Sequence, residues 1–170
     1  LFGPGEDKQF FRILDICGNV EFFSAGIKDI EAPIQGTLSQ QIFNARLQAT
    51  WLLQNAPATA DEDKDVARQY ADTLHGIVDG YSEEDFRVRM HLRYVVKYRD
   101  RAIWNALTQS DVLDIQQHLS HLYTDEQSAE LTRRFDLTVL RLMICILEGG
   151  NTKYYIEKIK TSVTGLLRKM

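Results

Sequence analysis

Apolar residues recur at helical spacing from residue 37 onward. Between Thr37 and Pro57 they share one helical face, made of Leu38, Ile42, Ala45, Ala49 and Leu52. Thr37 followed by Gln40 is a capping-box pattern, and proline ends a helix because it lacks a backbone N–H. This stretch is therefore predicted to be a helix. A second helix is predicted from about residue 63 to 81, with the stripe Val66, Tyr70, Leu74, Ile77 and Tyr81.

Further helix starts follow in the middle and last parts of the chain. Ser82 and Asp85 predict one start, and Thr108 with Asp111 predicts another. The helix after Thr108 has an amphipathic stripe formed by Val112, Ile115, Leu119 and Leu122. The last predicted helix carries Tyr155, Ile156, Ile159, Val163 and Leu166.

Between these lies a segment that is apolar nearly all round. Thr124 with Gln127 is a second capping-box pattern, and the helix it opens is expected to end near Glu148, before the glycine pair 149–150. One of its faces carries Leu131, Phe135, Thr138, Leu142 and Cys145, and the opposite side carries Leu137, Leu140, Ile144 and Leu147. Such a helix is buried among others. We therefore expect a mainly α fold, a bundle of about five to six helices around a buried central helix at about 125–148.

The first 36 residues follow a different pattern. FFRILDIC (10–17) is aromatic and β-branched enough for a strand, whereas 25–36 contains two glycines and Pro33 and is typical of a connector. We therefore expect a short β or irregular segment over 1–36 and a helical domain over 37–170.

The densest run of positive charge lies at 87–101. This basic strip contains a single acid, Asp100, and six cations: Arg87, Arg89, Arg93, Lys97, Arg99 and Arg101. In its first half, cations alternate with Val88, Met90, Leu92 and Tyr94. A period of two predicts an extended arm with one buried face, and the spacing after Val95 predicts a helix. Two roles compete: binding the phosphates of DNA, or pairing with acids of the fold such as Glu83, Glu84 and Asp85.

The overall charge of the chain argues against the DNA-binding role. The net charge is −4, so the chain outside the strip is acidic, unlike a dedicated nucleic-acid-binding domain. Cys17 and Cys145 lie far apart in apolar runs, as buried thiols of a reducing compartment do. No signal pattern is visible, and the longest apolar run (135–147) is too short to span a bilayer. We expect a cytoplasmic location and no membrane partner.

Catalytic motifs are missing from the sequence. The chain has no phosphate-binding GxxxxGK[ST] loop, GxGxxG, HExxH or GxSxG. His118 and His121 share a helical side, but two ligands are too few for a zinc site, so both are interpreted as surface histidines. His75 and His91 stand alone in the sequence. We therefore expect no catalytic residue, no metal and no cofactor within these 170 residues.

Three stretches together resemble one family. LFGPGEDKQFFRILDICGNVEFF resembles the segment after the last helicase motif in R subunits of type I restriction enzymes, which are related to DEAD/DEAH-box helicases. FRVRMHLRYVVKYRDRAIWNALTQSDV and RRFDLTVLRLMICILEGG resemble parts of the C-terminal helical region of these subunits. The resemblance implies that 1–36 is the tail of the motor lobe with its connector, and that 37–170 is part of a larger subunit.

The resemblance also implies a function. The parent subunit would couple ATP and Mg²⁺ to DNA translocation and cleavage, while this helical domain, itself not catalytic, would dock the motor onto the methyltransferase subunit. Weak contact of the basic strip with double-stranded DNA is also implied. The alternative is a nucleic-acid-binding accessory domain of a stand-alone helicase.

Tyr94, Tyr98 and Trp104, with Arg99 and Arg101, form an aromatic and cationic mixture that is typical of interfaces and are the candidate docking residues. The competing interpretation places Tyr98 and Trp104 in the core.

Overall fold

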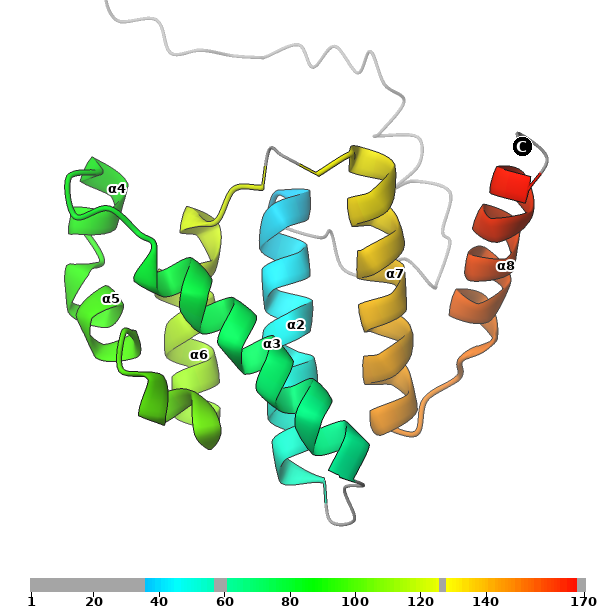
Figure 1. Ribbon diagram of the computed structural model, residues 1–170, viewed down its shortest axis with the longest axis horizontal. Helices are drawn as coiled ribbons and strands as arrows, with labels where there is room; N and C mark the ends of the chain where they lie inside the picture. Colours follow the sequence, from blue (N-terminus) through cyan, green and yellow to red (C-terminus); the bar gives the residue numbers. More distant parts are fainter. Residues whose placement is uncertain (1–35, 57–60, 126–127, 168–170) are drawn as a thin grey trace, which may run out of the picture. The chain divides into compact units, whose positions relative to one another are not determined.

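The computed structural model describes residues 36–56, 61–125 and 128–167 (Figure 1). The predicted strand at 10–17 and Cys17 lie outside these residues. The part that is described is mainly helical and contains no strand, which confirms the predicted fold class. Its helices are α2 (Leu38–Asn55), α3 (Asp61–Asp79), α4 (Phe86–Arg89), α5 (Leu92–Tyr98), η1 (Arg101–Asn105), α6 (Gln109–His118), η2 (Ser120–Leu122), α7 (Glu130–Leu147) and α8 (Lys153–Leu167).

The central helix is α2, and the prediction of α7 in that place is wrong. α3, α6 and η2 pack against α2, and α7 packs against it as well, so that in Figure 1 α2 stands between α6 and α7. α2 contributes Phe43 and Leu47 to one buried cluster and Ile42 to a second cluster shared with α7. Because α2 serves two cores, it holds the bundle together.

α7 buries only one of its two apolar sides. Leu137 and Leu140 are buried against α2, whereas Leu142 is half-buried and Leu131 is 76% exposed. The other side of α7 faces α8, which packs against α7 (Figure 1). α7 therefore lies between α2 and α8, and its contact with α8 leaves part of its apolar surface exposed.

The start of α7 also differs from the prediction. The helix begins at Glu130 with Ala129 as its N-cap, and no side chain caps it, so the predicted capping box of Thr124 is wrong. The preceding segment is instead fixed to the start of α2, because the Asp125 backbone N–H donates to Ser39 Oγ at 3.0 Å. At the other end, Gly149 adopts a φ of 71°, a left-handed conformation that glycine tolerates and that ends helices.

Local capping explains the remaining boundaries. Thr108 and Asp111 form the predicted capping box at the start of α6. Asp85 caps α4, since its carboxylate accepts the Arg87 backbone N–H at 2.8 Å. Thr37 caps α2, but the side chain of Gln40 donates to Ser120 Oγ at 3.1 Å, so only half of that predicted box is seen.

The extended arm predicted at 87–94 is wrong, because that segment forms α4 and the start of α5. Val88 and Val95, seven residues apart, are buried, while Met90 is 61% exposed. Burial therefore follows helical spacing, and the alternation of cations and apolar residues is coincidental. No helix in the described residues is long and apolar enough to cross a bilayer. The free thiol of Cys145 is half-buried.

Candidate functional site

Two arginines in the first half of the basic strip have no acidic partner among the residues that the structure describes. Arg87 pairs with Asp85 at 2.9 Å. Arg89 only approaches the Glu84 carbonyl at 3.5 Å, and the guanidinium of Arg93 lies over the Tyr94 ring, 5.5 Å from its centroid. Neither Arg89 nor Arg93 forms an ion pair with any residue that the structure describes, and both are exposed. These two cations remain available to a partner.

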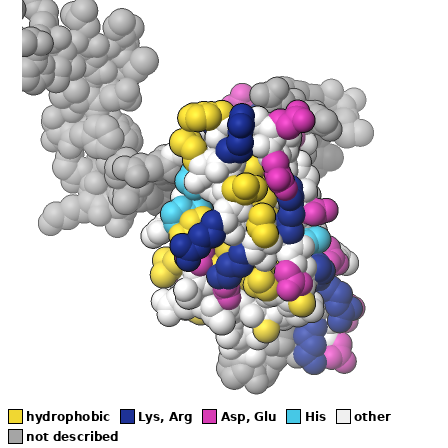
Figure 2. All heavy atoms as spheres, turned by 90° about the vertical axis from the view of Figure 1, so that its left-hand side faces the viewer, with side chains coloured by type: hydrophobic (Ala, Val, Ile, Leu, Met, Phe, Trp, Pro, Cys, Tyr) yellow, Lys and Arg dark blue, Asp and Glu magenta, His cyan; other side chains and the backbone are white. Residues whose placement is uncertain are grey.

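Apolar side chains surround these arginines. Phe86, Met90 and Val96 are 69%, 61% and 57% exposed, and they follow one another with Arg89 and Arg93 at near-helical intervals. These five residues are named the α4–α5 face. Figure 2 looks at this side of the molecule, where hydrophobic side chains lie among cations and acids. Exposed aromatic, methionine and arginine side chains together are typical of protein interfaces.

The sequence prediction missed the apolar members of this face. It assigned Met90 to the buried side of an extended arm and did not consider Phe86 or Val96. The signal was nevertheless present, because positions 86, 89, 90, 93 and 96 fall at helical rather than alternating spacing. In the structure these five residues, spread over α4, α5 and the turn between them, are exposed, whereas Val88 and Val95 are buried.

The next cation, Lys97, belongs to a partly buried polar network. Its ammonium donates to Asp111 Oδ1 at 3.0 Å, to Asp114 Oδ2 at 3.2 Å and to the Tyr98 hydroxyl at 2.8 Å. The Tyr98 hydroxyl in turn donates to Asp111 Oδ1 at 2.9 Å. Lys97 therefore fixes α5 to α6 and is not free to bind DNA.

Asp111 is the hub of this network. Burial opposes its ionisation, but hydrogen bonds from Thr108, Lys97 and Tyr98 prevail and lower the pKa of Asp111 to about 2. Burial raises the pKa of Tyr98 and keeps its hydroxyl protonated, while the hydrogen bond with Tyr98 is the main factor raising the pKa of Lys97. The site is thus a stable ion pair with structural, not acid–base, chemistry.

Replacing Asp111 by alanine is expected to lower the free energy of unfolding by about 1–3 kcal/mol, because a helix cap and charged hydrogen bonds are lost. Since the folded pKa lies below that of an unfolded aspartate, this contribution is present above about pH 4 and is lost as the pH falls toward 2. Urea unfolding at pH 7 and pH 2.5 measures both effects. Asp65→Ala, an exposed acid on α3, is the control and should change little.

The last two cations of the strip are used by the fold itself. Arg99 pairs with Glu83 and donates to the Tyr81 carbonyl at 2.8 Å. Arg101 pairs with Asp72 of α3 at 2.6 Å. These contacts attach the 99–101 turn to α3 and the loop after it. For Lys97, Arg99 and Arg101, the interpretation as partners of acids within the fold is therefore confirmed.

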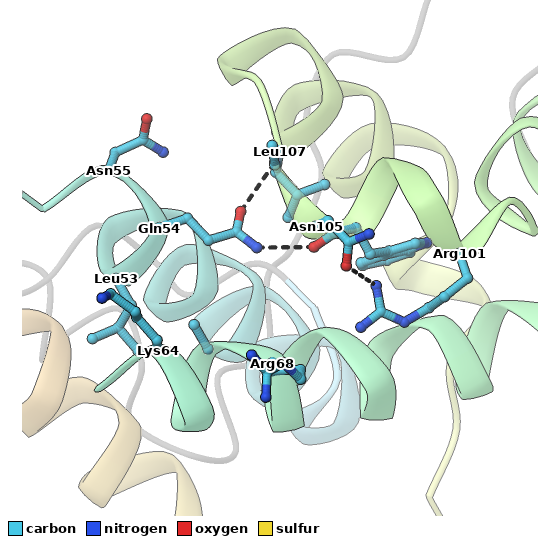
Figure 3. A pocket seen from close by; sticks show the side chains of 11 residues that line it. Leu53, Gln54, Asn55, Lys64, Arg68, Arg101, Asn105 and Leu107 are labelled. Atoms are coloured by element: carbon cyan, nitrogen blue, oxygen red, sulfur yellow. Dashed lines mark hydrogen bonds between the residues drawn. The ribbon is translucent and has the colours of Figure 1, made fainter. Parts of the chain in front are cut away.

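Arg101 also lines a cleft of about 440 Å³ where the end of α2, α3 and η1 meet (Figure 3). Lys64 and Arg68 lie on its α3 wall, but each pairs with an acid three residues earlier, at 2.9 and 3.0 Å. Gln54 crosses the cleft, donating to the Trp104 carbonyl and accepting from the Leu107 N–H. Because its cations are neutralised, the cleft does not favour a phosphate.

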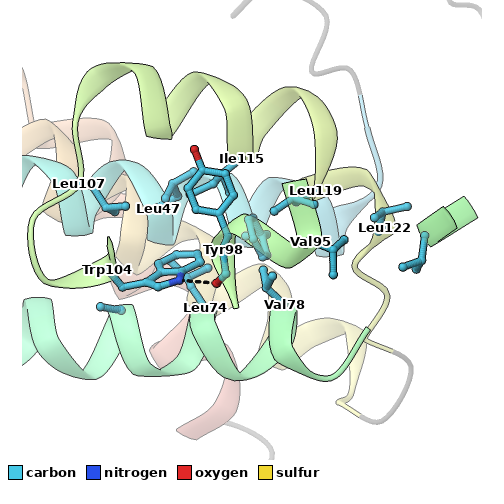
Figure 4. Packing of buried hydrophobic residues seen from close by; sticks show 13 residues of the cluster. Leu47, Leu74, Val78, Val95, Tyr98, Trp104, Leu107, Ile115, Leu119 and Leu122 are labelled. Carbon is cyan, nitrogen blue, oxygen red and sulfur yellow. Dashed lines mark hydrogen bonds between the residues drawn. The ribbon is translucent and has the colours of Figure 1, made fainter. Parts of the chain in front are cut away.

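The aromatic residues proposed for docking are mostly core residues. Tyr98 and Trp104 are both 0% exposed and lie within the cluster drawn in Figure 4, so their assignment to a docking surface is wrong. The Trp104 indole N–H donates to the Tyr98 carbonyl at 2.8 Å, which satisfies its one polar group. Tyr94 is half-buried, under the guanidinium of Arg93. Of the three, only Tyr94 adjoins the α4–α5 face.

Folding brings His91, which stands alone in the sequence, to His118 and His121. The ring of His91 lies 5.5 Å from that of His118 and 4.7 Å from that of His121, measured between centroids. Tyr94 stacks on His118 at 3.8 Å. Sequence analysis treated His91 as isolated, because nothing local indicates that the start of α5 meets the end of α6. Nowhere in the described residues do three or more His, Cys, Asp or Glu side chains converge as a metal site.

No family model, curated protein or solved structure matches this chain. Function must therefore be inferred from the geometry of the α4–α5 face and from the residues that carry the family resemblance.

Four of the six cations in the basic strip pair with acids of the fold, and this limits how tightly the strip can bind DNA. The chain should bind duplex DNA only weakly, with a dissociation constant above about 10 μM at 150 mM salt, in the range of non-specific binding. Replacing Arg89 and Arg93 by alanine should remove most of this binding, and replacing Arg68, an exposed cation of α3, should not. Fluorescence anisotropy with two unrelated duplexes measures it. Submicromolar binding that survives the double replacement would place the DNA site elsewhere.

Proposed function

We propose that this chain is a non-catalytic assembly and coupling domain that binds a protein partner through the α4–α5 face. The observation that carries the proposal is the exposure of Phe86, Met90 and Val96 around two arginines, Arg89 and Arg93, without acidic partners in the described residues. An isolated exposed apolar residue has no special meaning, but three exposed apolar residues within one short segment, beside arginines that have no acidic partner in the described residues, are suited to recognition.

The chemistry of this face defines its partner. Burying the three apolar side chains favours association through the hydrophobic effect. Burying Arg89 and Arg93 without compensation would oppose it, so the partner needs carboxylates at matching positions. A protein surface with an apolar centre flanked by aspartate or glutamate meets both conditions. Tyr94, half-buried next to Arg93, supports the rim of the contact.

The family resemblance suggests which protein this is. We propose the methyltransferase subunit of a type I restriction–modification complex as the partner. The parent R subunit would carry out ATP- and Mg²⁺-dependent DNA translocation and cleavage with residues outside this chain, in the cytoplasm. The described helices would transmit force between the motor and the methyltransferase. α2 suits this role, because it contributes to both buried clusters of the bundle.

The alternative, a nucleic-acid-binding accessory domain, receives less support from the contacts. Arg87, Lys97, Arg99 and Arg101 pair with acids of the same fold. DNA would have to compete with each of these ion pairs for its counter-charge. Of the six cations in the strip, Arg89 and Arg93, which have no acidic partner in the described residues, would contact phosphates without that cost, and two contacts give little affinity.

Direct binding tests the proposal. The chain is titrated by calorimetry into the methyltransferase subunit encoded beside the parent gene, with duplex DNA of the same concentration as a second titrant. A saturable complex with the methyltransferase, tighter than that with DNA, is expected. Absence of binding at about 100 μM protein, or tighter binding to DNA, would refute the docking role.

A further inference from the structure

Three imidazoles join two separate parts of the fold. His91 precedes α5, His118 ends α6, and His121 lies in η2. The ring of His91 contacts both others, with centroid separations of 5.5 Å to His118 and 4.7 Å to His121. His91, His118 and His121 are named the histidine cluster. It is one of the contacts by which α4 and α5, and therefore the α4–α5 face, are attached to the α6–η2 segment.

The charged groups that act on the cluster are cationic. From α4, the Arg87 guanidinium acts on His121, although Asp85 pairs with Arg87. From α5, Arg93 lies over the ring of Tyr94, which stacks on His118. From α6 and η2, the contributing groups are His118 and His121 themselves. Each added proton therefore meets positive charge.

These surroundings resist protonation. Burial first, and then the neighbouring His118, lowers the pKa of His91 below its usual value. His121 is exposed overall, but partial burial of its ring lowers its pKa as well, with further contributions from His91, His118 and Arg87. The tilted and edge-on contacts of His91 with His118 and His121 are therefore most favourable when the rings are neutral.

We propose that the histidine cluster makes the attachment of α4 and α5 acid-sensitive: protonation weakens the packing of these helices against α6 and η2 while the α2–α7 core stays folded. The α2–α7 core contains a different set of residues, and His75 is the only other histidine in the described residues. The acid-sensitive attachment of α4 and α5 does not depend on the proposed function. Its consequence, weaker partner binding in acid, rests on the proposed function.

Acid favours opening of the α4–α5 attachment because the open form binds more protons than the packed form. A histidine in an unfolded segment has a pKa near 6.5. Since the packed His91 and His121 have lower values, the open form binds more protons in acid. The packed form keeps its full advantage above about pH 6.5 and loses it as the pH falls toward 5. Each pKa lowered by one unit corresponds to about a tenfold change in the opening equilibrium.

Hydrogen–deuterium exchange of the free chain tests this, with intrinsic rates corrected for pH. Protection of residues 86–98 relative to α2 is expected to fall about tenfold between pH 7.5 and 5.5. His91→Gln, which removes no capping bond, should reduce that pH dependence by at least half. His75→Gln, outside the cluster, is the control and should keep it. Equal protection at both pH values, or full pH dependence in His91→Gln, would overturn the proposal.

A second measurement does not depend on any variant. In NMR titrations of the wild-type imidazoles, the midpoints of His91 and His121 are expected below about 6.5. Midpoints at or above that value would equally overturn the proposal. Both measurements use the chain without its partner, so they can fail while the docking role stands, and the docking role can fail while they succeed.

Discussion

Replacing both Arg89 and Arg93 by glutamate is expected to weaken the complex with the methyltransferase subunit at least about 100-fold, because like charges facing one another across an interface cost several kcal/mol. Both side chains are exposed and without ion pairs in the described part of the chain, so the melting temperature should stay within a few degrees of the wild-type value. Calorimetric titration and a thermal melt of the same preparations measure the two effects.

The matched control is the pair Arg68→Glu and Arg134→Glu. These residues are exposed cations of α3 and α7, outside the α4–α5 face, and their reversal changes the net charge by the same amount. If both double variants weaken the complex equally, general charge and not this face governs association. If neither does, the face is not the docking surface.

Replacing Trp104 by alanine is expected to lower the free energy of unfolding by about 3–5 kcal/mol, the range for large buried aromatics. Trp104 is 0% exposed and lies edge-on to Tyr98, with centroids 6.2 Å apart. Its removal leaves a cavity and an unpaired carbonyl at Tyr98. Urea unfolding at pH 7 measures the loss.

Leu131→Ala serves as the control for this experiment, because Leu131 is 76% exposed and its loss should cost less than about 0.5 kcal/mol. A Trp104→Ala variant as stable as the wild-type chain would contradict the core position of this residue. It would also restore Trp104 as a candidate for the docking surface.

Local chemistry made several elements predictable. The cap of α2 at Thr37 and the capping box of α6 depend on residues three positions apart, so the sequence contains the whole signal. The mainly helical class follows from apolar spacing in the same way. The prediction of an extended arm at 87–94 failed because eight residues fit both the period of two of a strand and the period of 3.6 of a helix. The burial of Val88 and Val95 shows that the helical period is the correct one.

Contacts between distant residues were beyond such reasoning. Arg101 meets Asp72 across 29 positions, and Lys97 meets Asp111 across 14, so neither pair is visible before the helices are packed. The same holds for the approach of His91 to His121. For α7, the pattern showed two apolar sides but not that α2 covers only one of them. The availability of each cation is therefore a property of the tertiary structure.

The most direct test is hydrogen–deuterium exchange of the chain with and without the methyltransferase subunit. The proposed docking predicts slowed exchange in residues 86–98 on complex formation, with α7 and α8 unchanged. Slowed exchange confined to α7 and α8, with 86–98 exchanging as in the free chain, would contradict the assignment of the α4–α5 face as the partner-binding surface.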